Sequence, residues 1–449
     1  MNSNDTAKET YLDVMGAAQK ELAGAPSWLR DLRRDSAARF AEVGFPTPRD
    51  EEWKYTDVTP IVQAGFKPAA RDVNGADPAR LEGFWFENLP SHRLVFINGH
   101  YSEKLSTPGA WPEGVTVMGL AAALRDQAHR LEPYLGHYAP QKIHGFAALN
   151  TALFTDGAYI HLGRGARLAK PLHLLYVSTG AANPLLSQPR NLVVAEADSQ
   201  AVLIENYVAI GESAYFTNAL TEVVVGPHAV IEHYRLQEEG AKAYHIGGLH
   251  AHLDRDGRFT AHGIDLGGRL VRNDLRSVLD AEGAECQLNG LYVLGGRQHV
   301  DNHTHIDHAR PRGTSREFYK GVLDGRSRAV FHGRVVVHPD AQHTDAQQVN
   351  NNLLLSRNAE ADTKPQLEIY ADDVKCAHGA TVGQLDPEAL FYLRSRAVDE
   401  AAARDLLTCA FARDVLSRLR LEPVRSQLER HLAAKLRVAA LHQAQEVLH

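Results

Sequence analysis

Cysteine is scarce in this sequence. Cys286, Cys376 and Cys409 are the only cysteines among its 449 residues, and three thiols cannot form the framework of a disulfide-rich domain. A long chain with so little cysteine is typical of a reducing compartment, and we therefore expect a cytoplasmic protein. We expect Cys286 and Cys409 to act as small hydrophobic side chains, because Cys409 lies close to a predicted helical apolar stripe.

Long hydrophobic runs and the common catalytic motifs are also missing. No segment approaches the roughly 18 consecutive apolar residues that a membrane span requires. Residues 1–23 carry four acidic side chains and no apolar segment, so we do not expect a signal peptide. The sequence has no P-loop, Cys-x-x-Cys, His-Glu-x-x-His or Gly-x-Ser-x-Gly motif. These absences favour a scaffold or assembly role over an enzyme, and we expect no membrane partner.

The composition is that of an ordinary globular protein. The chain has 48 basic and 55 acidic residues, which gives a net charge of −7, whereas a general nucleic-acid binder is normally basic. Apolar residues make up 44% and charged residues 23% of the sequence, which excludes a disordered or collagen-like chain. We therefore expect two or three folded domains and no nucleic-acid partner.

Local patterns predict three regions. Residues 1–140 form a mainly helical N-terminal domain, residues 141–385 a β core, and residues 386–449 a C-terminal helical domain. The β core is predicted from short runs rich in β-branched residues, which recur at intervals of roughly 8 to 12 residues. Examples of these runs are residues 172–177, 191–194, 201–204, 222–225 and 229–234.

Two arrangements of the β core remain open. Residues 163–166 and 226–229 both combine a turn with a small residue, and this recurrence favours a solenoid of stacked flat strands. The repeat has no fixed period, so a β-sandwich is the alternative.

The C-terminal region begins with a strong helix signal. Asp386, Pro387 and Glu388 supply an N-cap, a proline at the first helical position and an acid that complements the helix dipole. Leu406, Leu407 and Phe411 fall on one predicted apolar stripe. Such helices could cap an open end of the solenoid or present an apolar groove to a partner.

Residues 299–308 contain the densest group of histidines. On a strand, His303, His305 and Asp307 share one face, which resembles a metal-binding pattern. The alternative is a row of polar side chains on the outer face of a solenoid.

Cys376 and His378 form a second candidate site. In an extended segment they lie on one face, where both could ligate a soft or borderline metal ion. They could also act as a nucleophile and its base. The remaining alternative is a purely structural role.

Several long blocks in the C-terminal third form a recognisable pattern: residues 331–337, 345–356, 365–370, 372–381 and 390–396, with the upstream segments 52–56, 96–99 and 148–152. Together these blocks resemble the SufB/SufD family of iron–sulfur cluster assembly scaffold proteins. The chain resembles its SufD branch, because Pro365 stands where SufB carries a cysteine and Gly379 stands where SufB carries a glutamate. Ala397 departs from the glycine that is usual in the family.

This resemblance implies a fold and a set of partners. The fold would be a right-handed parallel β-helix flanked by helical domains. The β-helix would pair with SufB, and the C-terminal helices, with Leu406, Leu407 and Phe411, would bind the ATPase SufC. His378 and Cys376 would contribute to a transient iron–sulfur cluster shared with SufB, with no cofactor held tightly by the isolated chain. The exposed sheet edge could also pair two copies of the isolated chain.

Two alternatives to this scaffold function remain at the sequence level. One is an independent metal-dependent enzyme that uses residues 299–308. The other is a thiol-based enzyme with Cys376 as the nucleophile and His378 as its base.

Overall fold

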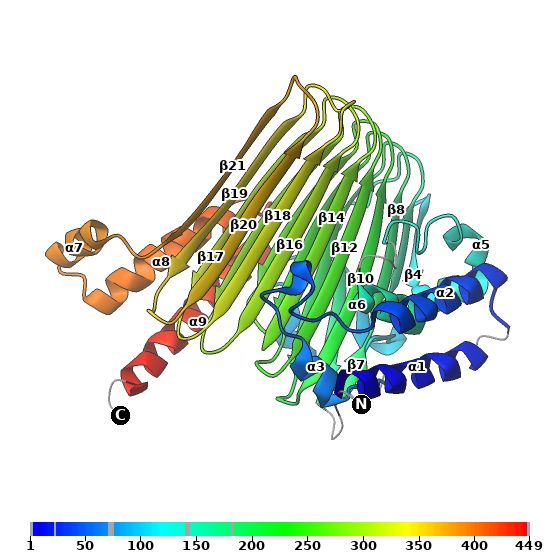
Figure 1. Cartoon of the computed structure of the whole chain (residues 1–449), viewed down its shortest axis with the longest axis horizontal. Coiled ribbons are helices and arrows are strands. Elements are labelled where there is room, and N and C mark those ends of the chain that lie inside the picture. Colours follow the sequence, from blue (N-terminus) through cyan, green and yellow to red (C-terminus); the bar gives the residue numbers. More distant parts are fainter. Residues whose placement is uncertain (1–2, 22–23, 71–75, 140–143, 181–183, 447–449) are drawn as a thin grey trace.

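Two long sheets face each other through the middle of the chain, and the backbone alternates between them (Figure 1). The computed structural model describes residues 3–21, 24–70, 76–139, 144–180 and 184–446. One sheet has eleven strands and ends at β20, and the other has ten strands and ends at β21. From β9 onward consecutive strands lie in opposite sheets, and each pairs in parallel with the strand one turn away. This is a β-solenoid, so the predicted mainly-β core is confirmed and the sandwich alternative is wrong.

The strands of the eleven-stranded sheet are β1 (Lys67–Pro68), β4 (Val115–Gly119), β5 (Ala158–Leu162), β7 (Leu185–Ser187), β8 (Arg190–Ala195), β10 (Tyr215–Val225), β12 (Tyr244–Leu253), β14 (Leu270–Leu279), β16 (His299–His308), β18 (Arg328–Val337) and β20 (Glu360–Ile369). Those of the ten-stranded sheet are β2 (His92–Ile97), β3 (His100–Tyr101), β6 (Leu172–Thr179), β9 (Gln200–Ile210), β11 (Val230–Glu238), β13 (Arg258–Asp265), β15 (Glu285–Leu294), β17 (Thr314–Leu323), β19 (Asp345–Leu354) and β21 (Lys375–Gly383). Only the β2–β3 and β4–β5 pairs are antiparallel among these ladders.

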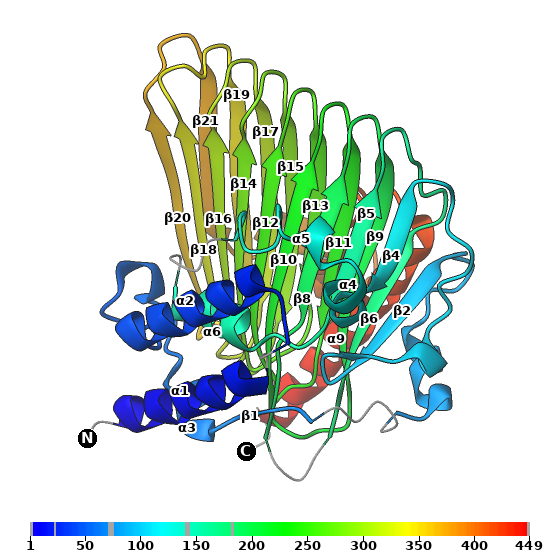
Figure 2. The same cartoon turned by 90° about the vertical axis from the view of Figure 1, so that its right-hand side faces the viewer.

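Helices flank the solenoid at both ends of the sequence, as predicted (Figure 2). The N-terminal helices are α1 (Ser3–Glu21), α2 (Ser27–Val43), α3 (Thr59–Ala64), α4 (Leu120–Asp126), α5 (Ala128–Leu131) and α6 (Gly145–Leu153), and the C-terminal helices are α7 (Pro387–Ser395), α8 (Glu400–Leu416) and α9 (Glu422–Glu446). Short 3₁₀ helices span Glu51–Trp53, Pro78–Phe84 and Glu103–Leu105. No helix in the described part of the chain is long and apolar enough to cross a membrane.

The predicted boundary between residues 140 and 141 lies outside the described residues. β2 and β4 lie before that boundary in the sequence, and they pair with β6 and β5, which lie after it. The first 140 residues therefore supply strands to both sheets as well as helices. The division into domains at 140 and 385 stays a prediction.

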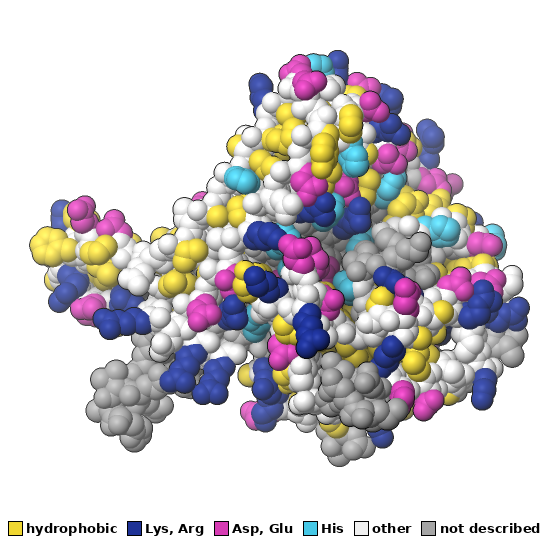
Figure 3. Space-filling view, viewed as in Figure 1, with side chains coloured by type: hydrophobic (Ala, Val, Ile, Leu, Met, Phe, Trp, Pro, Cys, Tyr) yellow, Lys and Arg dark blue, Asp and Glu magenta, His cyan; other side chains and the backbone are white. Residues whose placement is uncertain are grey.

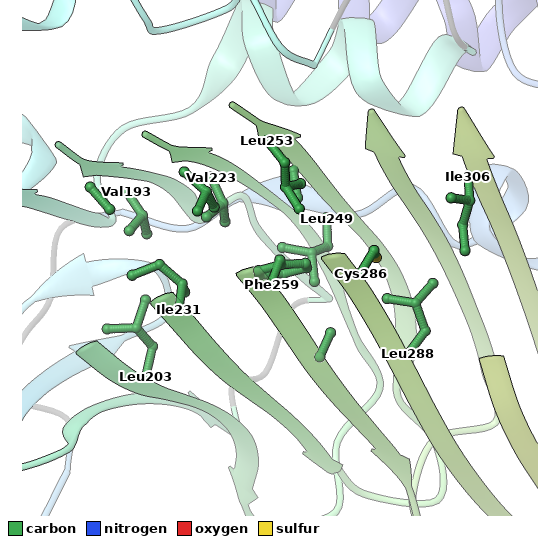
Figure 4. Packing of buried hydrophobic residues seen from close by; sticks show 14 of the residues in the cluster. Val193, Leu203, Val223, Ile231, Leu249, Leu253, Phe259, Cys286, Leu288 and Ile306 are labelled. Carbon is green, nitrogen blue, oxygen red and sulfur yellow. The ribbon is translucent and has the colours of Figure 1, made fainter. Parts of the chain in front are cut away.

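The hydrophobic core fills the space between the two sheets. Leu203 and Ile231 point inward from one sheet and meet Val193 and Val223 from the other (Figure 4). Cys286 belongs to this core and is 2% exposed, which confirms its predicted role as a small hydrophobe. Burial of continuous inward rows provides the main drive to stack the turns.

The outer face of each sheet is covered by a different helical region. Phe216 and Tyr244 of the eleven-stranded sheet pack against residues of α1, α2 and α6. Tyr234 and Leu291 of the ten-stranded sheet pack against α8 and α9, and Cys409 joins this contact as predicted. The helices thus hide apolar outer surface that a solenoid alone would expose.

One corner of the solenoid repeats the same hydrogen bond from turn to turn. A single residue per turn has a positive φ there and donates its backbone N–H to a carbonyl of the next turn; these residues are Asp198, His228, Asp256, Gly283, Arg312 and His343. A small residue commonly follows and points inward, as Ala229 does. This corner explains the turn-plus-small-residue pattern, and the ladder ends where His343 donates to the carbonyl of Asp373.

Candidate functional site

The C-terminal end of the solenoid is open. No described strand pairs with the free side of β20 or of β21, which are the last strands of their sheets. Ile369, Tyr370 and Val382 leave 41%, 62% and 46% of their surfaces exposed there. An edge with unpaired backbone groups and exposed apolar side chains is a surface on which another chain can add strands.

Cys376 and His378 both lie on β21, two residues apart, and so share one face as predicted. Their register partners on β19 are Ala346 and Gln348, which are buried in the solenoid interior. Cys376 packs against the core and is partly buried, whereas His378 is exposed. The pair therefore occupies interior positions of the last turn, which no further strand in the described part of the chain covers.

The surroundings of Cys376 do not activate its thiol. Burial raises the pKa of Cys376, although the backbone amide of Ala346 partly opposes the shift. A nucleophilic cysteine needs a lowered pKa, so this environment argues against the thiol-enzyme alternative. The same environment is compatible with a metal-ligand role, in which the thiol loses its proton only when a metal ion binds.

A buried carboxyl group lies one turn further inside. Glu317 is the register partner of Gln348, whose side-chain amide donates a hydrogen bond to it. Burial raises the pKa of Glu317 to about 7. The interior below His378 is thus polar.

The histidines of β16 divide between two faces. Val300, Ile306 and His308 point into the interior, while His299, His303 and His305 lie on the outer face. The expected row of polar side chains on the outer face is therefore present.

An N-terminal segment around the 3₁₀ helix Glu51–Trp53 covers this row. Thr56 donates to Asp301 Oδ2 at 2.5 Å, and Arg272 donates to the Glu52 carbonyl at 2.6 Å while its guanidinium lies 3.8 Å from the Trp53 ring. Trp53 is buried. The segment is therefore fastened to the sheet by polar and cation–π contacts rather than lying loose on the surface.

The fastened segment brings Glu52 between two histidines. Glu52 Oε2 lies 3.2 Å from His303 Nδ1 and 3.3 Å from His332 Nδ1. Hydrogen bonds from His303 and then His332 hold the pKa of the Glu52 carboxyl well below its usual range. Burial opposes the charging of His303, but the Asp301 carboxylate overcomes it and raises the pKa of His303 to about 9.

The structure gathers a different set from the predicted His303, His305 and Asp307. His305 Nε2 contacts Asp307 Oδ1 at 3.1 Å, and Arg276 donates to Asp307 at 2.7 Å, so these two residues are paired with each other and with an arginine. His303 instead meets Glu52 and His332. His332 and Glu52 both lie in the family-like blocks, but the sequence carries no signal that joins them.

The predicted partner-binding residues of the C-terminal helices differ in exposure. Leu406 is 54% exposed, and Leu407 lines a surface pocket with Phe391 and Tyr392 of α7. Phe411 turns toward the solenoid, where the Lys320 ammonium lies 4.3 Å from its ring. Hydrophobic side chains gather on α7 at the left of Figure 3.

Phe391 and Tyr392 are 74% and 57% exposed. They are the residues that the predicted set missed, although both stand in the block 390–396. The exposed apolar surface of the C-terminal helices thus centres on α7 and Leu406, whereas Phe411 packs toward the solenoid.

Comparison with known proteins matches nearly the whole chain to two family models. Residues 5–174 match the "SufBD protein N-terminal region", and residues 176–411 match the "SUF system FeS cluster assembly, SufBD core domain". An iron–sulfur cluster assembly SufBD family protein of Synechocystis is 34% identical over 95% of this chain and 96% of its own length. The iron–sulfur cluster assembly protein SufD of Escherichia coli is 32% identical over 89% of this chain and 91% of its own length, and SufD of Bacillus subtilis is 25% identical over 90% and 93%.

Proposed function

This chain belongs to the SufB/SufD family of iron–sulfur cluster assembly proteins, and on that premise we propose that it is the SufD-type scaffold subunit of a SufBCD complex. Its role is to complete, with SufB, a site on which a nascent cluster forms. A reducing, cytoplasmic setting belongs to the proposal, because a thiol such as that of Cys376 can serve as a ligand only in its reduced form.

The open end of the solenoid is the observation that carries this proposal. Both sheets stop at strands whose free sides no described strand pairs, and apolar side chains are exposed beside them. A homologous solenoid such as SufB could continue both sheets across this end by β-augmentation. The same edges could pair two copies of the chain when SufB is absent.

Cys376 and His378 suit a shared cluster rather than a self-contained one. They stand at the open end, where a docked SufB would cover them. One thiolate and one imidazole are fewer than the usual four ligands of a cluster, so SufB would have to supply the others. The cluster is in this proposal a cargo that leaves, not a resident cofactor.

The ATPase SufC is proposed to bind the apolar surface of α7 and Leu406. This surface projects beyond the solenoid (Figure 1) and exposes two aromatic rings, Phe391 and Tyr392. Exposed aromatic residues on a small apolar patch are typical anchors of protein interfaces.

Co-purification and reconstitution test the proposal together. The full chain is co-expressed with SufB and SufC, the complex is isolated without oxygen, and iron and sulfide are supplied. We expect a stable complex of all three chains and more cluster per complex, by visible absorbance, than SufB and SufC form without this chain. A chain that fails to co-purify with SufB, or that leaves cluster yield unchanged, would contradict the scaffold role.

A further inference from the structure

We propose that Glu52, His303 and His332 form a binding site for one divalent first-row transition metal ion, such as Zn²⁺ or Fe²⁺. This site lies on the outer face of the eleven-stranded sheet, away from the interior positions of Cys376 and His378. The proposal does not depend on the scaffold function.

The backbone register sets the two imidazoles beside each other. His303 on β16 and His332 on β18 are register partners in a parallel ladder, and both point outward. Neighbouring strands lie roughly 4.8 Å apart, and the two ring centres are 4.9 Å apart. Two imidazoles at this spacing can reach a common ion.

Glu52 supplies the third ligand from a distant part of the sequence. One carboxylate oxygen faces both Nδ1 atoms at 3.2 and 3.3 Å, and the three potential ligand atoms all lie within 4.8 Å of one another. Small side-chain rotations would bring all three to the roughly 2.0–2.2 Å of metal–ligand bonds. Trp53 is buried beneath this segment and fixes its position.

The far nitrogen of each imidazole already faces an acceptor. His303 Nε2 lies 3.0 Å from Asp301 Oδ1, and His332 Nε2 lies 3.5 Å from Gln366 Oε1. The Gln366 amide nitrogen donates to Glu368 at 2.7 Å, which turns its oxygen toward His332. Metal-bound histidines almost always donate their other N–H to such an acceptor. Each Nδ1 can then bind the ion once it has released to solvent the proton that it shares with Glu52.

The ligand set and its surroundings select the class of ion. Two imidazoles and one carboxylate suit zinc, iron and neighbouring metals, whereas magnesium and calcium prefer oxygen ligands. A cavity of about 290 Å³ adjoins the three side chains and leaves room for water or an exogenous ligand at the open positions. Glu52 is 56% exposed, so an ion can enter from solvent.

Isothermal titration calorimetry of the tag-free full chain with Zn²⁺ tests this site. The absorbance of bound Co²⁺ then shows the geometry of its ligands. We expect one equivalent of either ion to bind, and Glu52→Gln and His332→Gln each to weaken binding at least tenfold. Matched controls are Glu51→Gln, whose carboxylate pairs with Lys364, and His161→Gln, whose imidazole pairs with Glu196. Both controls should bind as the parent does.

Two results would overturn the proposal. One is the absence of a stoichiometric site in the parent chain. The other is unchanged metal binding in folded Glu52→Gln and His332→Gln proteins. If binding were lost only in His378→Ala, the ion would occupy the open end of the solenoid and not the Glu52 site. Circular dichroism and thermal unfolding of each variant establish that it is folded. Because Glu52 is half-exposed and glutamine has nearly the same shape, we expect Glu52→Gln to fold as the parent chain does.

Discussion

Gln348 and His378 are register partners on the last two strands of one sheet, so an interior row of the solenoid ends at a histidine that no further described strand covers. The same row runs back from these two residues through Glu317, Leu288 and Ala261 to the buried His233. After the apolar Ala261 and Leu288, its last three members, Glu317, Gln348 and His378, are all polar. A partner that docks there would seal polar groups, and not only apolar ones, into the joined interior.

Loss of His378 should impair cluster formation in the complex. We expect His378→Ala to lower cluster yield by roughly tenfold, the scale on which a change at a metal site alters affinity, and Cys376→Ala to lower it as well. The measurement is visible absorbance and iron content of the reconstituted complex. His343→Ala is the control, because that histidine is 56% exposed at the solenoid corner. Normal yield in both variants would show that the site lies elsewhere.

Replacement of Glu317 should change the pH dependence of stability. Burial raises the pKa of Glu317 from 4.5 to about 7, so the folded state holds this proton more tightly than the unfolded state. The contribution of the protonated Glu317 carboxyl to the free energy of unfolding is complete below its pKa in the unfolded state. It is lost as the pH rises through its pKa in the folded state. Glu317→Gln should therefore flatten the loss of stability between about pH 4.5 and 7 and stabilise the protein at pH 8 by up to about 3 kcal/mol.

Denaturant unfolding at several pH values measures this effect. Glu196→Gln, a change at a largely exposed carboxylate, should leave the pH profile as in the parent chain. An unchanged slope in Glu317→Gln would mean that the Glu317 carboxyl is better solvated than its position implies.

Proline in β21 should separate partner binding from folding. Lys375 donates its N–H to the carbonyl of Thr344, the residue just before β19, and in a parallel ladder alternate residues bond to the same side. The N–H of Ala377 should therefore face β19, and that of Ala380 should face the open edge. Ala380→Pro should reduce association with SufB at least tenfold with little loss of stability, whereas Ala377→Pro should destabilise the last turn itself.

Quantitative pull-down and thermal unfolding of the two variants provide the readouts. If Ala380→Pro bound SufB as tightly as the parent chain, the β21 edge would not be the pairing surface.

The C-terminal helices should tolerate a change at Leu406 but not at Phe411. Leu406→Asp places a charge on an exposed apolar surface, so it should weaken SufC binding and leave the melting temperature nearly unchanged. Phe411→Ala removes packing against Lys320 and the solenoid and should cost about 1–3 kcal/mol of stability. Isothermal titration with SufC and thermal unfolding distinguish the two effects. Equal loss of binding without destabilisation in both variants would contradict the different roles assigned to them.

The solenoid could be predicted from sequence, but its register could not. β-branched runs mark strands such as β6, β8, β9, β10 and β11, and the corner residues explain the small side chains that follow the turns. The sequence separation between register partners in adjacent turns varies from 26 residues for Tyr244 and Leu270 to 33 for Tyr159 and Leu192. Because the turns differ in length, no fixed period appears in the sequence.

The same variation hid the Glu52 site. A shift of register by one residue moves every side chain to the opposite face, so the pairing of His303 with His332 could not be derived without the turn geometry. Glu52 reaches them through contacts of Thr56 and Trp53 that leave no periodic signal. Cys376 and His378 were recognisable because a local two-residue spacing is enough to place them on one face.

The turn-to-turn stacking also has a dynamic consequence. Each turn is held mainly by the turn before and the turn after it, and the turn that ends in β21 has only one such neighbour. Local opening free energies should therefore fall toward this end, and backbone amides of β20 and β21 should exchange hydrogen for deuterium sooner than those of β12 and β13. A docked partner would act as the missing turn and slow the exchange of the β20 and β21 amides. The exchange rates of these amides would therefore show whether a partner is bound.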